Sequence, residues 1–248
     1  MTPTLVPHHP ARDWAEIQER MLVPLYEAVY DRLGVVAGSR VLGLGCGSGL
    51  ALLMAAARGA RVAGVDRDHA RVALARERLP RAPLGAADGA AVPEAVREGG
   101  PYDVITAFHG PAALAGVTLP AERGAAVVVA GWGPPERCAT ASVRRVAARL
   151  AGWTATEHDG PRDCLAEAVA AAGLRPSGSG GVACPFGYAD RDSAVRGLLS
   201  TGEFDAALRA TEPDQVEKEL LEALEPYARR DGTVWMPNVF RYVVARVP

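Results

Sequence analysis

Four glycines at alternate positions are the feature of the sequence that points most directly to ligand binding. Gly43, Gly45, Gly47 and Gly49 lie in VLGLGCGSG, between a short apolar run and an alanine-rich run. Glycine has no Cβ atom, so the backbone of such a turn can pass close to a ligand. Asp66 ends the next apolar run, where a carboxylate can accept hydrogen bonds from both hydroxyls of a ribose. The spacing therefore indicates a ligand site at which Asp66 could bind a ribose, with a tight strand–helix turn that binds nothing as the alternative.

The spacing of the turn excludes the two common phosphate-binding loops. A G-x-x-x-x-G-K-[ST] loop needs a lysine, and the only lysine of the chain is Lys218. The dinucleotide fingerprint G-x-G-x-x-G would need a third glycine at Ser48 or at Leu50. What remains is G-x-G-x-G, a turn suited to a bulky ligand without a phosphate at this point.

Two histidines are candidates for a general base, because the pKa of histidine lies near neutral pH. His109 follows the apolar run PYDVITAF, at the edge of the sheet where ligands bind in open α/β folds. His158 lies in TEHDGP, in the second half of the chain. A pocket-lining or helix-capping role for His109, and a solvated loop position for His158, stay open as alternatives.

Apolar runs that alternate with helical patterns predict the elements that position these residues. A helix is expected from Trp14 to Leu33, with a kink at Pro24. Helices are also expected over 48–59 and 67–80. Strands are expected over 39–45, 60–66, 82–88, 101–109 and 124–133. This alternation predicts a parallel sheet with helices on both faces.

The pattern changes after Gly133. Helices are expected over 135–152 and 163–174 and through most of 190–230, with strands over 181–188 and 238–247. The Pro-Gly-Ser run over 174–181 is expected to form a loop. We therefore expect one α/β domain over residues 1–248, with a helical insertion before its final strand.

Several segments resemble the class I S-adenosylmethionine-dependent methyltransferases. VLGLGCGSG and VAGVDRD resemble their nucleotide-binding region, which usually reads V-L-[DE]-x-G-x-G-x-G and has an acidic residue at the end of the second strand. GAADGAAVP resembles the third-strand segment, and PYDVITAFHG resembles the fourth strand. VVVAGWGPPERC and NVFRYVVAR resemble a bacterial subset that acts on small molecules.

The resemblance implies a fold, a cofactor and a division of the chain. The fold is a Rossmann-like, mostly parallel seven-stranded sheet with an N-terminal helical lid, and the cofactor is S-adenosyl-L-methionine. The expected parts are a lid over 1–37, a cofactor-binding core over 38–133, substrate-side helices and an insertion over 134–235, and a closing strand over 236–248.

The resemblance also assigns site residues. Asp88 would meet the adenine amino group, whereas His109 and, after it, His158 remain the base candidates from their positions in the chain. Cofactor contacts fall on Trp14, Gly45, Cys46, Gly47, Gly49, Asp66, Arg67, Ala87, Asp88, Gly89 and Phe108. The methyl acceptor would lie against Trp132, Tyr188 and Trp235, with anchoring of the insertion as the alternative role of Tyr188 and Trp235.

Gly43 departs from the family pattern, which has Asp or Glu at this position to help hold the ammonium end of the cofactor. A charge-assisted contact of this kind is worth about 1–2 kcal/mol. Three functions therefore stay open: methyl transfer to a small molecule such as a secondary metabolite, a non-methylating cyclisation, decarboxylation or rearrangement, and non-catalytic binding of a small molecule.

Composition narrows the possible partners. The net charge of −2 provides no basic surface for nucleic acid or for an anionic membrane. The four cysteines are far apart and lack histidines at metal-ligand spacing, so no metal site is expected. The N-terminus has neither the basic nor the apolar region of a secretory signal, and no apolar run is long enough to span a membrane. We expect a cytoplasmic protein, with no prediction of its oligomeric state.

Overall fold

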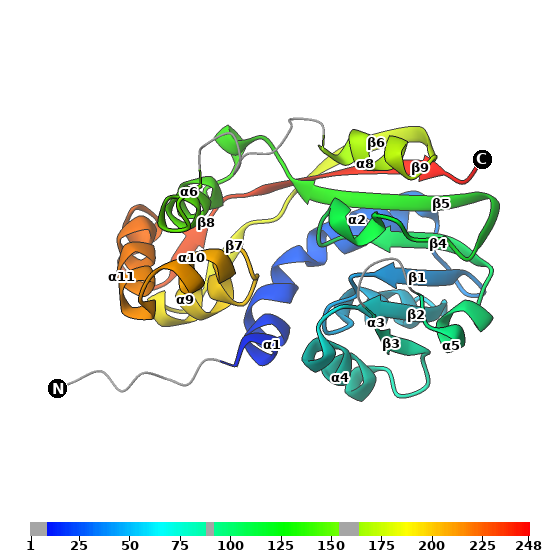
Figure 1. Cartoon of the computed structure of the whole chain (residues 1–248), viewed down its shortest axis with the longest axis horizontal. Helices are drawn as coiled ribbons and strands as arrows, with labels where there is room; N and C mark the ends of the chain where they lie inside the picture. Colours follow the sequence, from blue (N-terminus) through cyan, green and yellow to red (C-terminus); the bar gives the residue numbers. More distant parts are fainter. Residues whose placement is uncertain (1–8, 88–91, 154–163) are drawn as a thin grey trace.

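The computed structural model describes residues 9–87, 92–153 and 164–248 (Figure 1). Within these residues the main sheet has seven strands in the order β3-β2-β1-β4-β5-β9-β6. The strands are β1 (Arg40–Leu44), β2 (Arg61–Asp66), β3 (Leu84–Ala86), β4 (Tyr102–Ala107), β5 (Ala121–Trp132), β6 (Arg175–Ala183) and β9 (Val239–Arg246). β1 to β5 pair in parallel, whereas β9 is antiparallel to both of its neighbours. The predicted α/β fold with a mostly parallel seven-stranded sheet is confirmed.

Both faces of the sheet are covered because successive residues of its strands point to opposite sides. Val41 belongs to a core cluster shared with the N-terminal segment, α3 and α4. Leu42 belongs to a second cluster with Val96, Leu114 and Leu165, on the other face. The helices that follow the core strands are α3 (Leu50–Ala57), α4 (His69–Arg78), α5 (Glu94–Glu98), η3 (Pro111–Leu114) and α8 (Cys164–Ala171). The apolar residues on the two faces thus hold the sheet between two layers of helices, and the glycine turn lies at the edge of this sheet.

The N-terminal helical segment, residues 10–33, is less regular than its apolar spacing predicts. It consists of α1 (Pro10–Asp13), a π-helical turn η1 (Trp14–Gln18), a 3₁₀ turn η2 (Glu19–Leu22) and α2 (Val23–Leu33). The predicted kink at Pro24 is wrong, because this proline lies in the first turn of α2, where a missing N–H costs no hydrogen bond. The helical geometry changes before Pro24, in the two turns that precede it.

The run over 174–181 is not a loop, contrary to the sequence prediction. Residues 175–183 form β6, an edge strand that pairs with β9. Gly180 lies so close to Tyr242 that a Cβ atom there would be 2.5 Å from the tyrosine hydroxyl. The small residues therefore allow close packing. Hydrogen bonds with β9 stabilise this strand, although its sequence lacks the apolar pattern typical of strands.

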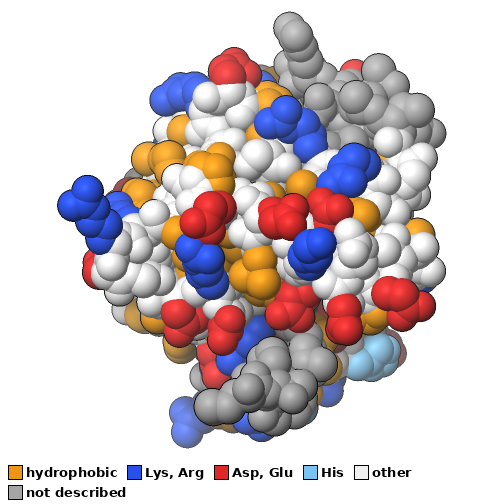
Figure 2. All heavy atoms as spheres, turned by 90° about the vertical axis from the view of Figure 1, so that its left-hand side faces the viewer, with side chains coloured by type: hydrophobic (Ala, Val, Ile, Leu, Met, Phe, Trp, Pro, Cys, Tyr) orange, Lys and Arg blue, Asp and Glu red, His pale blue; other side chains and the backbone are white. Residues whose placement is uncertain are grey.

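The helical insertion forms a second lobe on the left of Figure 1, next to the N-terminal helical segment. It contains a two-stranded sheet, β7 (Phe186–Tyr188) and β8 (Val234–Met236), of which β8 was not predicted. Its helices are α6 (Thr140–Leu150), α9 (Arg191–Leu199), α10 (Asp205–Ala210) and α11 (Pro213–Leu224), with short 3₁₀ turns η4 (Pro135–Arg137) and η5 (Glu225–Tyr227). Basic and acidic side chains are interspersed on the face of this lobe drawn in Figure 2. In the part of the chain that is described, no helix combines the length and the apolar character needed to cross a bilayer.

Candidate active site

The glycine turn joins β1 to α3 and has the backbone geometry that glycine favours. Gly45, Gly47 and Gly49 have φ angles of 65°, 57° and 84°, which side-chain-bearing residues rarely adopt. The Cys46 N–H donates to the Val65 carbonyl at 2.9 Å, so the turn is bonded to β2. The glycine spacing in the sequence thus reflects a turn that needs glycine at these positions.

Three side chains cover the open face of Gly47. A Cβ atom at Gly47 would lie 2.8 Å from Glu19 Oε1, 2.9 Å from Trp14 Nε1 and 3.1 Å from His109 Cε1. Trp14 and Glu19 come from the N-terminal helical segment, whereas His109 follows β4. The missing side chain of Gly47 therefore lets side chains from segments far apart in the sequence lie against the turn, and we call this place of close approach the Gly47 cradle.

Asp66 connects the second strand to this turn. Its Oδ2 accepts a hydrogen bond from the Gly47 N–H at 2.7 Å, and its Oδ1 accepts one from the Asp68 N–H at 2.9 Å. The carboxylate is almost fully buried. Because each carboxylate oxygen has two lone pairs, both retain capacity to accept a further hydrogen bond.

His109 is held through both ring nitrogens. Nδ1 lies 2.7 Å from the Gly45 carbonyl oxygen and Nε2 lies 2.9 Å from the Tyr26 hydroxyl. A carbonyl only accepts, so Nδ1 carries the proton and Nε2 accepts from Tyr26. Burial lowers the pKa of His109, although the nearby Glu19 and Asp66 carboxylates oppose this effect. The structure thus places a neutral imidazole beside the turn, with its accepting nitrogen bonded to Tyr26.

Glu19 is the most important residue of the site that sequence reasoning missed. Its side chain is fully buried, and its Oε2 accepts hydrogen bonds from the Ser48 hydroxyl and from Arg78 Nη1, the latter at 2.7 Å. Arg78 also donates to the carbonyl oxygens of Ser48 and Ala15, each at 3.0 Å. This network bonds the N-terminal helical segment to the start of α3 and to the end of α4.

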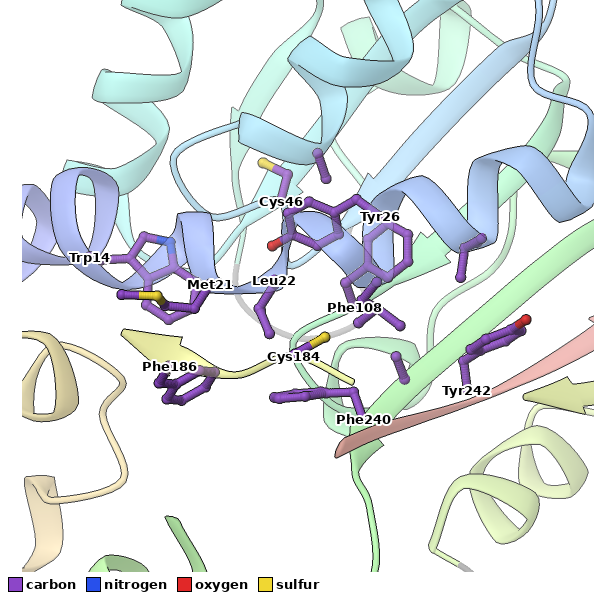
Figure 3. Packing of buried hydrophobic residues seen from close by; sticks show 14 of the residues in the cluster. Trp14, Met21, Leu22, Tyr26, Cys46, Phe108, Cys184, Phe186, Phe240 and Tyr242 are labelled. Atoms are coloured by element: carbon purple, nitrogen blue, oxygen red, sulfur yellow. The ribbon is translucent and has the colours of Figure 1, made fainter. Parts of the chain in front are cut away.

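Several predicted cofactor residues lie around the same turn. Phe108 is buried against Tyr26, with ring centroids 4.8 Å apart, and Figure 3 shows the two rings side by side. Cys46 is buried in the turn, and this burial raises the pKa of its thiol strongly. The Ala87 N–H donates to the Asp66 carbonyl at 3.0 Å, whereas the Arg67 side chain is exposed. Asp88, Gly89 and the candidate base His158 lie outside the described residues.

The three residues predicted to contact the methyl acceptor differ in their burial. Trp132 packs on Phe240 with centroids 4.6 Å apart, and its indole N–H donates to Glu203 Oε1 at 2.8 Å. Tyr188 is buried and its hydroxyl donates to Gln18 Oε1 at 2.8 Å, in the N-terminal helical segment. Trp235, in contrast, is 41% exposed on the outer side of β8. The structure thus brings Trp132 and Tyr188 into the packed region between the lobes but leaves Trp235 at the surface.

Residues 41–119 match the family model described as "Methyltransferase domain", a range that includes the glycine turn, Asp66 and His109. Over this range the chain matches a methyltransferase domain, as the resemblance in the sequence predicted. No curated protein sequence matches the chain.

Solved structures share the fold of this methyltransferase domain and of the segments around it. An S-adenosylmethionine-dependent methyltransferase from Thiobacillus denitrificans, solved with S-adenosylhomocysteine, is 20% identical with a TM-score of 0.52, covering 97% of this chain and 94% of that one. The YjhP protein of E. coli is 19% identical with a TM-score of 0.52, covering 96% and 95%. A functionally unknown protein from Deinococcus radiodurans is 20% identical with a TM-score of 0.52, covering 90% and 85%. At these identities the likeness is one of fold.

The polar atoms around the glycine turn fit S-adenosylmethionine, the cofactor expected from the sequence. Trp14 Nε1 is buried and has no hydrogen-bond partner among the described residues. It faces the same Gly47 cradle as one carboxylate oxygen of Glu19. An unused donor, acceptor oxygens on Asp66 and a glycine face without a side chain match a ligand that carries a ribose and an amino-acid end.

Proposed function

We propose that the chain is an S-adenosylmethionine-dependent methyltransferase that acts on a small, partly apolar molecule such as a secondary metabolite. The observation that carries the proposal is the hydrogen bond between the Asp66 carboxylate and the Gly47 N–H. It bonds the carboxylate predicted to bind the ribose directly to the glycine turn. The methyltransferase-domain match over residues 41–119 supports the same function.

In the proposed reaction, the bound cofactor supplies a methyl group on a positively charged sulfur. The protein contributes mainly by holding the acceptor in line with that methyl group and by excluding water. Asp66 would accept hydrogen bonds from the ribose hydroxyls, and the glycines of the turn would allow close approach of the ligand. Trp14 would cover the ligand from the N-terminal helical segment.

His109 stays the proposed base for a hydroxyl acceptor. Its Nε2 is the nitrogen that accepts a proton, and this atom is bonded to the Tyr26 hydroxyl. For proton transfer, the acceptor hydroxyl would have to take the place of the Tyr26 hydroxyl at Nε2. If methyl transfer needs no base, His109 would instead position the Gly45 carbonyl through Nδ1.

An apolar acceptor is supported by the aromatic side chains next to the N-terminal helical segment. Trp132, Phe186 and Phe240 pack together, with Phe186 and Phe240 centroids 6.2 Å apart. Figure 3 places Phe186 and Phe240 beside Cys184, below Leu22 of the N-terminal helical segment. Interspersed charges on the second lobe favour a small molecule over nucleic acid, whose binding needs a continuous basic surface. We further propose that residues 1–248 act as one unit, in the cytoplasm.

Calorimetry with S-adenosylhomocysteine tests the proposal directly. We expect the wild type to bind at micromolar concentration, and Gly47→Val to lose binding while it stays folded, because the valine side chain would fill the cradle. Gly232→Val is the matched control, since Gly232 also has a positive φ angle but no atom within 4 Å of the position a Cβ would take. Equal affinity in the wild type and in a folded Gly47→Val variant would contradict the assignment of this turn.

Incubation with labelled S-adenosylmethionine and candidate acceptors then tests the chemistry. Transfer of the label to a small molecule supports a methyltransferase. Tight cofactor binding without transfer to any acceptor would favour the non-methylating reaction or the non-catalytic binding protein.

A further inference from the structure

The π-helical turn at the N-terminus brings two polar side chains together over the glycine turn. The Glu19 N–H donates to the Trp14 carbonyl, five residues earlier, which is the hydrogen bond of a π turn. In a π turn, residues five apart lie nearly above one another, whereas in an α-helix they point to different sides. Trp14 and Glu19 therefore present their polar atoms to the same glycine, Gly47.

The two side chains each have an atom with unused hydrogen-bonding capacity. Trp14 is 5% exposed, and its Nε1 has no hydrogen-bond partner among the described residues. Glu19 Oε2 is bonded to Arg78 and Ser48, whereas the one hydrogen bond that Oε1 accepts from the described residues is a weak one from the Leu50 N–H at 3.4 Å. A free donor and a nearly free charged acceptor thus lie side by side in a buried place.

This pair is complementary to an α-amino acid in its zwitterionic form. An ammonium group donates hydrogen bonds and pairs with a carboxylate, whereas a ligand carboxylate accepts from an indole N–H. A zwitterion is neutral overall, and the Glu19 charge is already balanced by Arg78. Binding a zwitterion would therefore satisfy both atoms without leaving an uncompensated buried charge.

Gly43, near the end of β1 and just before the glycine turn, has little room for a carboxylate of its own. A Cβ atom at Gly43 would lie 3.2 Å from Cys46 Cβ and 3.3 Å from Leu52 Cδ2. Contacts this close require the neighbouring side chains to shift. An acidic side chain directed at the turn is instead provided by the N-terminal helical segment.

We propose that Glu19 and Trp14 bind the amino-acid end of the cofactor, with Glu19 Oε1 accepting from the ammonium group and Trp14 Nε1 donating to the carboxylate. This inference rests on the proposed function. It assigns to Glu19 the role that an acidic residue at position 43 has in the family pattern. Arg78 and Ser48 position the Glu19 carboxylate through its other oxygen.

Two ligands separate this role from a purely structural one. S-adenosylhomocysteine has the amino-acid end, whereas 5′-methylthioadenosine has the same nucleoside and sulfur without it. In calorimetry, Glu19→Gln should weaken binding of S-adenosylhomocysteine by about ten- to a hundredfold. The same variant should change the affinity for 5′-methylthioadenosine by less than about twofold, since no contact to that ligand is lost.

Matched variants refine the test. Trp14→Phe keeps an aromatic ring but removes the N–H. It should weaken the binding of S-adenosylhomocysteine by about three- to tenfold and leave the binding of 5′-methylthioadenosine unchanged. Glu16→Gln makes the same chemical change on an exposed residue of the same π turn and should leave both affinities unchanged. An equal loss for both ligands in Glu19→Gln would overturn the proposal, because Glu19 would then only support the fold.

A ligand without the amino group tests the proposal even if Glu19→Gln does not fold. The wild type should bind S-adenosylhomocysteine that lacks its α-amino group about ten- to a hundredfold more weakly than the parent compound. Equal affinity for the two compounds would overturn the proposal. A wild type that binds neither S-adenosylhomocysteine nor 5′-methylthioadenosine would overturn the proposed function itself, and this inference with it.

Discussion

The Gly45 carbonyl accepts a hydrogen bond from His109 Nδ1 at 2.7 Å and thereby fixes the imidazole in one tautomer. The other nitrogen, Nε2, lies 2.9 Å from the Tyr26 hydroxyl and accepts from it. The backbone of the glycine turn thus determines which nitrogen of His109 can receive a proton. The first two predictions follow from this arrangement.

Replacing His109 should slow the proposed reaction without weakening cofactor binding. We expect His109→Ala to reduce kcat by about 10²-fold, the size of effect typical of a lost general base. His109→Gln should be nearly as slow, because an amide keeps a hydrogen bond but cannot take up the proton. Steady-state kinetics and calorimetry with S-adenosylhomocysteine measure the two effects separately. Full activity in both variants would restrict His109 to a structural role.

The stability of the protein should depend on pH through His109. Burial lowers the pKa of His109 below its ordinary value of 6.5, so the unfolded chain binds the proton more readily than the folded one. The free energy of unfolding should therefore fall as the pH drops below about 6.5, and stop falling on this account once the pH is below the folded-state pKa. Scanning calorimetry between pH 8 and 5 should show a smaller decrease in Tm for His109→Gln than for the wild type. Parallel curves for the two proteins would show that His109 is not a protonation site linked to unfolding.

Asp66→Asn should affect both stability and binding. An amide replaces one acceptor oxygen by a donor, which would face the backbone N–H of Gly47 or of Asp68. We expect a loss of about 1–3 kcal/mol in the free energy of unfolding. Binding of S-adenosylhomocysteine should weaken by about ten- to a hundredfold through the lost ribose contact. If the 2′-deoxy analogue binds the wild type as tightly as the parent compound, Asp66 only supports the turn.

Gly180→Ala should destabilise the edge of the sheet. The added Cβ would be 2.5 Å from the Tyr242 hydroxyl, and the Tyr242 ring is also held by Arg32, whose Nη1 is 3.2 Å from the same hydroxyl. We expect the free energy of unfolding to fall by about 1–3 kcal/mol. Gly181→Ala is the control on the same strand, because its nearest atom would be 3.8 Å away. Urea denaturation of both variants measures the difference, and equal stabilities would contradict the close packing at Gly180.

The parallel part of the fold could be predicted because its sequence signals are local. Apolar runs around Leu42 and Ile105 are typical of buried strands, and glycine spacing indicated the turn. β6 could not be predicted in this way. Its residues are small and polar, and its stability comes from hydrogen bonds with β9, which lies more than fifty residues later in the chain.

The site could be predicted only where it follows regular periodicity. Asp66 and His109 were found because each follows a strand, at the edge where ligands bind in parallel sheets. Glu19 was missed because a helical period of 3.6 residues places it away from Trp14, whereas the π turn brings the two together. The signal that could have identified it is the missing acid at Gly43, which suggests that an acidic side chain from another segment faces the turn.

The N-terminal helical segment is bonded on both of its sides, and this has a consequence for how two bound ligands affect each other. On one side Glu19 pairs with Arg78 of α4, next to the glycine turn. On the other side Arg196 of α9 donates to Asp13 at 3.0 Å, and Tyr188 donates to Gln18. The same segment therefore borders the cofactor turn and the aromatic residues proposed for the acceptor. A cofactor that holds this segment in place also holds one side of the acceptor site, and the reverse is true of a bound acceptor. Each ligand should therefore raise the affinity for the other ligand by the same factor. For the proposed enzyme, calorimetry should therefore show that the acceptor binds more tightly when S-adenosylhomocysteine is present, and S-adenosylhomocysteine more tightly when the acceptor is present.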